Sequence, residues 1–246
     1  MHFHDILYGT ENNINLNAKL LIAKDSGLRV SDIISLNCDI ILNNPEKDFI
    51  PITLKTKKTG YIAKTFLGTD AINTLKLYLK KRQKGTNKIA PETITEKSPL
   101  FVTPKGKRIS RETLSNNIKQ AFQRYGEQHM SAHSLRKKLQ TDLEKANVNV
   151  NWIDQMLGHQ LINSRDAYSL PTDEELQDAY INAYEKHIKI TPETLTINKI
   201  IQQQQPTQEI NFDVIETRTL EEAKKALSKG YKYEMEYDGI KLFTKK

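Results

Sequence analysis

The sequence predicts an α+β chain, in which a mainly helical domain with a small antiparallel sheet precedes a small C-terminal β-α-β-β module. Capped apolar runs at helical spacing fill most of the chain up to residue 187. Two runs rich in β-branched residues flank Thr59-Gly60 and predict a hairpin. A glutamine run with Pro206 predicts a linker. We therefore expect domain boundaries at 1–190, 191–210 for the linker, and 211–246.

The first helix is expected to end at Gly27, a residue suited to the left-handed position after a helix. Ser31 can cap the short helix D-I-I-S-L that follows. Arg29 lies in the turn between the two, beside free helix N–H groups that would favour an anion. An ordinary surface arginine fits this stretch equally well.

Three further elements follow the hairpin. Thr69 or Asp70 can cap a helix through L-K-L-Y-L-K-K-R. Residues 98–110 predict a short buried strand and a Pro-Lys-Gly turn. Ser110 can cap a helix that runs to about Tyr125.

The C-terminal module begins with the strand-like run F-D-V-I-E-T. Thr219 and Glu222 form a capping box for the next helix, and Gly230 suits its end. Two strand-like runs joined at Asp238-Gly239 predict a closing hairpin.

Charge is concentrated in one part of the chain. The net charge is +7 over 246 residues, yet residues 51–140 alone hold 20 Lys/Arg against 5 Asp/Glu. Such a concentration favours a nucleic acid partner over general solubility. The single cysteine, Cys38, excludes an intramolecular disulfide and a thiolate zinc site. Without an apolar run of membrane length or a signal-like start, we expect a cytoplasmic, DNA-associated protein.

One stretch combines the residues of a metal-free phosphate site. His133 and Arg136 are one helical turn apart and can reach one target together. Gly158-His159 follows, and Tyr168 lies nine residues beyond that histidine. Alone, a histidine after glycine is more often structural, and a tyrosine at helical spacing usually packs in a core.

These motifs resemble the catalytic domain of tyrosine recombinases, the family of phage integrases and Xer-type resolvases. S-G-L-R-V-S-D-I-I-S-L resembles the first family box, S-A-H-S-L-R-K-K-L the second, and M-L-G-H-Q the family's Gly-His segment. The resemblance covers roughly residues 14–188. It implies six catalytic residues: Arg29, Lys58, His133, Arg136, His159 and Tyr168. Lys58 is chosen by counting back from F-L-G, and Lys55 and Lys57 remain alternatives.

The resemblance implies a site-specific recombinase or integrase that works through a 3′-phosphotyrosine. Tyr168 would attack a DNA phosphodiester, and His133 would accept its proton. The two arginines would hold the non-bridging oxygens, and His159 would donate a further hydrogen bond to them. Lys58 would protonate the leaving 5′-oxygen. No metal or cofactor is expected, because these side chains supply the positive charge.

Further basic side chains are expected to contact DNA: Lys55, Lys57, Lys64, Lys105, Lys107, Arg108, Arg111 and Lys137. The expected partners are double-stranded recombination sites and further copies of the chain, as a homotetramer during synapsis and a monomer when free. The family's N-terminal core-binding domain has no counterpart before residue 14, so a separate core-binding fragment is another expected partner.

Three other functions fit the same residues. One is a type IB topoisomerase-like nicking and closing activity. Another is a non-catalytic DNA-binding regulator on this scaffold, and the third is a hydrolase of nucleic acid. Tyr125, Tyr180 and Tyr184 are alternative nucleophiles.

Overall fold

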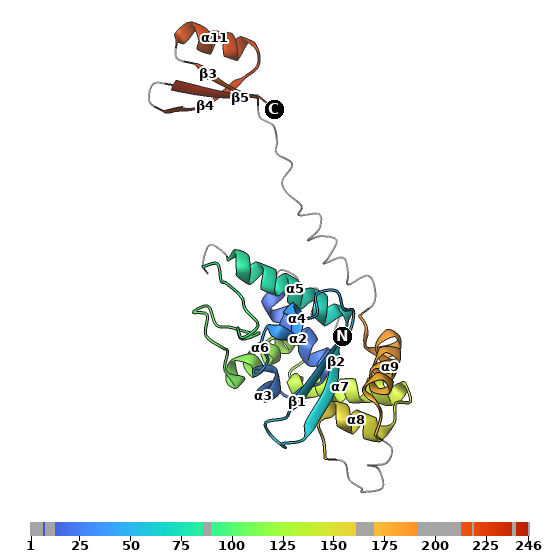
Figure 1. Cartoon of the computed structure of the whole chain (residues 1–246). Coiled ribbons are helices and arrows are strands. Elements are labelled where there is room, and N and C mark those ends of the chain that lie inside the picture. The colour runs from blue at the N-terminus through green and yellow to red at the C-terminus, as the bar shows by residue number, and fades with distance from the viewer. Residues whose placement is uncertain are drawn as a thin grey trace. The chain divides into compact units, whose positions relative to one another are not determined.

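The structure, a computed structural model, describes residues 7, 13–85, 90–160, 170–190, 213–217, 219–237 and 240–245. The chain divides into two compact units, residues 1–194 and 195–246, which are shown in Figure 1 and described separately below. In the described ranges, no helix has the length and apolar character needed to cross a membrane.

The first unit is mainly helical. Its helices are α2 (Ile14–Ser26), α3 (Val30–Ile33), α4 (Asp39–Leu42), α5 (Thr69–Lys84), α6 (Arg111–Arg124), α7 (Ala132–Lys145), α8 (Val150–Leu157) and α9 (Asp173–Ala183), which continues as the π-helical turn η2 (Tyr184–Ile188). Strands β1 (Ile50–Lys55) and β2 (Ile62–Leu67) form an antiparallel hairpin, with Ile50 opposite Leu67 and Lys55 opposite Ile62. The predicted mainly helical domain with a small antiparallel sheet is confirmed.

Helix α2 is the centre of this unit. All of its residues from Leu16 to Ser26 are buried. It packs against α5, α6, α7 and β2, as can be followed in Figure 1. A helix with no solvent face must bury its polar residues too, and α2 buries Lys19, Lys24 and Asp25. These charges need partners or a function.

Two predicted helix caps were wrong. Arg29, and not Ser31, is the N-cap of α3, because its carbonyl accepts from the N–H groups of Asp32 and Ile33. Gly68, and not Thr69 or Asp70, precedes α5. A Cβ at Gly68 would lie 2.1 Å from the Tyr184 ring, so tertiary packing selects glycine there over a capping side chain.

The predicted strand within residues 98–110 was also wrong. The described chain forms only isolated bridges here, Asn37 with Pro99 and Val102 with Arg108. Pro99 and Pro104 both lack an N–H donor, which prevents a continuous ladder.

Two other predicted helix ends are confirmed, at Gly27 and Ser110. Gly27 ends α2 with a φ of 59°, in the left-handed region that favours glycine, and Gly158 ends α8 in the same region with a φ of 64°. Ser110 caps α6 by accepting from the Thr113 N–H. These ends fix where the chain turns around the cleft described below.

The second unit contains β3 (Asp213–Thr217), α11 (Leu220–Ser228), β4 (Lys232–Tyr237) and β5 (Ile240–Lys245). The strands form an antiparallel sheet in the order β3-β5-β4. Thr219 and Glu222 form the capping box of α11, and Ala223 and Ala226 are buried. The predicted linker, 191–210, lies outside the described residues.

Candidate active site

A cleft of about 680 Å³ lies where α3, α6, α7, the β1–β2 turn and the end of α8 meet. Five of the six predicted catalytic residues line it: Arg29, Lys58, His133, Arg136 and His159. The sixth, Tyr168, lies outside the described residues. Within those residues, no three His, Cys, Asp or Glu side chains gather as metal ligands would.

Arg136 is the buried base of the cleft, with 5% of its surface exposed. Its Nη1 donates to the Gly27 carbonyl (2.7 Å) and its Nη2 to the Leu157 carbonyl (2.6 Å). Both carbonyls lie at helix ends, where such groups lack helical partners and a cation is favoured. Burial, with Arg29 nearby, lowers the pKa of Arg136 to about 10, so the guanidinium stays charged at neutral pH.

His159 is held between an acid and this arginine. Its Nδ1 lies 2.8 Å from Oδ1 of Asp154, and its Nε2 lies 2.8 Å from Nη2 of Arg136. These partners assign the proton to Nδ1, because the carboxylate accepts and the guanidinium only donates. In this arrangement Nε2 is an acceptor, whereas the sequence predicted that His159 would donate to a phosphate.

Asp154 was not among the site residues predicted from the sequence. It lies on α8, five residues before His159, and its carbonyl also accepts from the His159 N–H (2.9 Å). An acid near the end of a short helix that precedes Gly-His is the only sequence signal for it. Recognising the contact requires the left-handed turn at Gly158, which folds the imidazole back onto α8.

Arg29 lines the cleft and carries an unpartnered donor among the described residues. Its side chain is half-buried, and its Nη1 is buried without a hydrogen-bond partner in the described part of the chain. A buried donor left unpaired costs about 1–3 kcal/mol. An oxyanion bound in the cleft would remove that cost.

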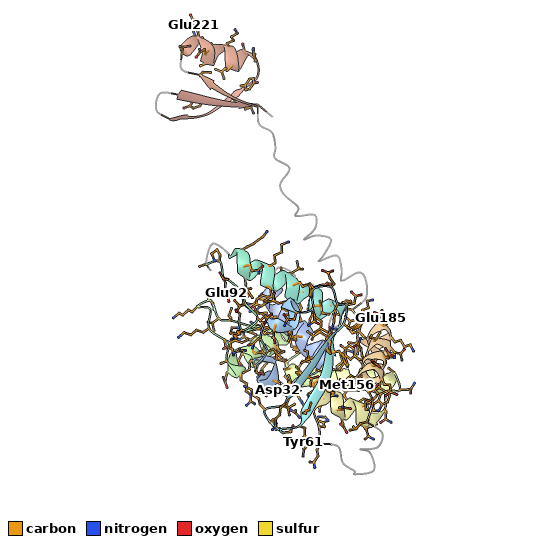
Figure 2. The ribbon with its side chains drawn as sticks, viewed as in Figure 1. Asp32, Tyr61, Glu92, Met156, Glu185 and Glu221 are labelled. Atoms are coloured by element: carbon orange, nitrogen blue, oxygen red, sulfur yellow. The ribbon has the colours of Figure 1, made fainter. Side chains whose placement is uncertain are left out.

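The turn of the β1–β2 hairpin forms hydrogen bonds with two neighbouring elements. Asp32 (labelled in Figure 2) accepts from the Lys57 N–H at 2.8 Å, and the Thr59 hydroxyl donates to the Gly158 carbonyl at 3.2 Å. A Cβ at Gly158 would lie 2.6 Å from Cγ2 of Thr56. The turn therefore packs directly against the start of α3 and the end of α8.

The hairpin lysines differ in position. Lys57 and Lys58 both line the cleft, whereas Lys55 is not among the lining residues. Lys58 also acts electrostatically on His133. This proximity favours Lys58 among the three predicted alternatives.

His133 is exposed in the first turn of α7. Partial desolvation lowers its pKa below the usual value, and four cations, Lys137, Arg136, Arg29 and Lys58, lower it further. The imidazole is therefore mostly neutral at pH 7, the state in which it can accept a proton.

The predicted DNA-contacting residues fall into two groups. Lys57 and Arg111 line the cleft, and the exposed Lys137 lies one turn after His133. Lys55, Lys105 and Lys107 are also exposed.

Two others are bound within the protein. Lys64 pairs with Asp173 at 2.6 Å. Arg108 donates to the carbonyls of Ile34 and Leu36 and to Oδ1 of Asn37. Their charges are engaged in intramolecular contacts.

The alternative nucleophiles Tyr180 and Tyr184 lie in the core. Both are fully buried, and their hydroxyls bond to the Asp25 carbonyl and the Asp70 N–H. Burial first, then nearby carboxylates, raises the pKa of each phenol. Neither can reach a DNA phosphate without unfolding of this core.

The model of the phage integrase family matches residues 2–175. Tyrosine recombinase XerD of Chlamydia muridarum (strain MoPn / Nigg) is 26% identical over 155 residues, which cover 63% of this chain and 48% of that protein. Tyrosine recombinase XerC of Rickettsia bellii (strain OSU 85-389) is 27% identical over 180 residues, which cover 72% and 54%. The chain thus spans about half the length of these relatives.

Two solved structures share the fold. The integrase from mycobacterium phage Brujita has a TM-score of 0.50 at 21% identity, covering 75% of this chain and 57% of that one. XerH site-specific recombinase, bound to a palindromic difH substrate in a post-cleavage complex, has a TM-score of 0.50 at 16% identity, covering 82% and 50%. At these identities the likeness establishes the fold alone.

Proposed function

This chain belongs to the phage integrase family, and we propose that it is a site-specific DNA recombinase that cleaves and rejoins strands through a 3′-phosphotyrosine. One observation carries the proposal. A single cleft gathers three guanidinium groups, two imidazoles and two lysines from segments up to more than 100 residues apart. One buried guanidinium nitrogen there has no partner among the described residues. Such a cleft suits a phosphodiester.

The two arginines would bind the non-bridging oxygens of the phosphate. Arg136 uses three of its five N–H donors on Gly27, Leu157 and His159, so two remain for the ligand. Arg29 would add its unpartnered Nη1. Donors held in place before the reaction stabilise the charge that develops on phosphorus-bound oxygens.

Tyr168 would attack the phosphorus atom. The Tyr–O–P bond forms as the P–O5′ bond breaks, His133 accepts the phenolic proton, and Lys58 donates a proton to the leaving oxygen. Rejoining reverses each transfer, so the energy of the ester is kept. Cleavage requires His133 to be neutral and Lys58 to be protonated at the start.

Asp154 would act as a positioning residue. It holds His159 in the tautomer whose Nε2 contacts Arg136. That contact adds a third restraint, on the same Nη2 that donates to the Leu157 carbonyl, and would help to keep the remaining donors available to the cleft. His159 would then serve by orienting Arg136.

A suicide substrate tests the proposal. A duplex nicked near the cleavage point should trap a covalent protein–DNA adduct on a denaturing gel. Tyr168→Phe should abolish the adduct, and Tyr125→Phe, which alters a half-buried tyrosine, should leave it intact. An adduct that survives in Tyr168→Phe would assign the nucleophile elsewhere, and no adduct in the parent chain would refute the activity for this chain.

The partners are proposed on the same basis. XerH is bound to its difH substrate, and we propose double-stranded recombination sites as the ligands of this chain, with a homotetramer at synapsis. Because the chain spans about half of its relatives, a core-binding fragment supplied separately is a further proposed partner. Supercoil relaxation without two-site recombination would instead indicate a topoisomerase-like activity.

A further inference from the structure

A second, smaller cavity lies between the first turns of α2 and the last turns of α6. Its volume is about 230 Å³, the space of roughly eight water molecules at about 30 Å³ each. The cavity shares no lining residue with the catalytic cleft. Its cationic lining residues are Lys19 and Arg124, and no carboxylate lines it within the described residues.

Lys19 is the unusual residue of this cavity. It is 5% exposed, and its one polar contact within the described residues joins Nζ to Oδ1 of Asn117 at 2.8 Å. An ammonium group has three donors, so two remain unused in the described part of the chain. A buried charge normally requires an opposite charge. Burial lowers the pKa of Lys19 to about 8, which leaves most of the population charged at pH 7.

The other lining side chains add donors. Arg124 ends α6 and makes no ion pair within the described residues. Asn15 and Gln120 contribute amide groups, and the oxygen of Asn117 accepts from Lys19, which leaves its NH₂ as a further donor of the lining. Donors that converge from two helices suit a tetrahedral oxyanion, and the guanidinium fork matches phosphate geometry.

This cavity is on the flank of α6 away from the cleft. Successive helix residues are about 100° apart around the axis. Arg111 and Ser115, which line the cleft, are therefore within about 40° of one another. The cavity-lining residues Asn117, Gln120 and Arg124 lie about 180–240° round from Arg111. One helix thus separates two cationic sites.

We propose that this cavity binds a phosphate group, held by Lys19 and Arg124. Two sources can present that chemistry: free phosphate, or the backbone of a DNA duplex that extends beyond the cleft. The second source rests on the proposed recombinase function, and the first does not.

Calorimetric titration of the full chain with sodium phosphate at pH 7, against chloride at the same ionic strength, tests the site. Lys19→Met keeps the aliphatic stem, and Arg124→Gln changes an exposed residue. Each should weaken phosphate binding about tenfold, because a charge-assisted hydrogen bond is lost. Lys119→Gln, on the exposed face of the same helix, is the matched control and should bind as the parent does. No phosphate binding by the parent chain, or equal binding by all variants, would overturn the proposal.

Duplex binding at several salt concentrations identifies the source. Loss of one phosphate contact should reduce the slope of log K against log [salt] by about 0.9 in both cavity variants. That result, with weakened phosphate binding, assigns a DNA phosphate. An unchanged slope with weakened phosphate binding assigns free phosphate. The covalent adduct is measured separately, so its absence would refute the recombinase proposal while leaving the phosphate site standing.

Discussion

Two regions of the first unit bury positive charge, and they differ in whether the protein itself supplies the partners of that charge. At the end of α2, Lys24 pairs with Asp25 (2.7 Å) and Asp70 (3.4 Å) and donates to the Ile188 carbonyl (2.8 Å). In the catalytic cleft, the Arg29 Nη1 has no partner among the described residues and Arg136 keeps two spare donors. The Lys24 ammonium has its partners without a ligand, whereas the cleft guanidinium groups would gain theirs from an oxyanion.

This difference distinguishes structural from functional charge in this fold. Asp70 also accepts from the Ile190 N–H, so the Lys24 cluster joins α2 and α5 to the chain after η2. Removing one member should therefore cost stability. Removing a cleft cation should cost chemistry and little stability.

The largest expected effect is on the Lys24 cluster. Lys24→Met would leave two buried carboxylates without their cation and should lower the free energy of unfolding by about 3–5 kcal/mol. Chemical denaturation measures it, with Lys80→Met, an exposed lysine on α5, as the control. A loss below about 1 kcal/mol would show that the carboxylates protonate easily, and the contrast would fail.

Next is Arg29→Lys, which keeps the charge but removes the planar fork. The rate of adduct formation should fall about 10²–10³-fold, as when one preorganised donor to a reacting oxyanion is lost. The free energy of unfolding should change by less than about 1 kcal/mol. Arg111→Lys, also in the cleft, should have a much smaller effect on the rate. A large stability loss with normal chemistry would place Arg29 with the structural charges.

Asp154→Asn should have a smaller effect on the same reaction. Loss of the charged hydrogen bond to His159 should slow adduct formation about 10–100-fold. Asp154→Glu should restore part of the rate if orientation is the cause. Measuring the rate at several pH values distinguishes a misoriented His159 from a loss of folding, because an imidazole freed from Asp154 would add a new pH dependence. An unaltered rate and profile would remove Asp154 from the mechanism.

The smallest expected effect is a shift in the midpoint of the pH–rate profile, which His133 should set. Its pKa is lowered by desolvation and then by nearby cations, so the rate should rise with pH through a midpoint below about 6.5 and then level off. Lys137→Gln removes one of those cations, which makes protonation easier and moves the midpoint upward. Lys138→Gln, the neighbouring lysine, should not move it. A downward shift in Lys137→Gln would contradict His133 as the base.

Local sequence rules located most helices and the hairpin, and the family resemblance supplied the set of cleft residues. Both failed where packing between distant segments decides the structure. The predicted hairpin and the ends at Gly27 and Gly158 follow from turn chemistry. The true start of α5 at Gly68 could not be predicted, since it depends on the ring of Tyr184, more than 100 residues away. Asp154 was missed for a similar reason.

The complete burial of α2 could not be predicted from the sequence either. Lysines at positions 19 and 24 would normally indicate a solvent face, whereas both are inside. Only the fold shows that Lys24 is paired with carboxylates, whereas Lys19 contacts only Asn117 within the described residues.

The fastening of the β1–β2 turn has a consequence for how the cleft opens. Because Lys57 is bonded to Asp32 and Thr59 to Gly158, the lysine turn, the start of α3 and the end of α8 are expected to move as one body. The amide proton of Lys57 should then exchange with solvent only when this body comes apart. The exchange rate of this proton would report how often the whole site opens by local unfolding. Binding of a phosphodiester should slow that exchange.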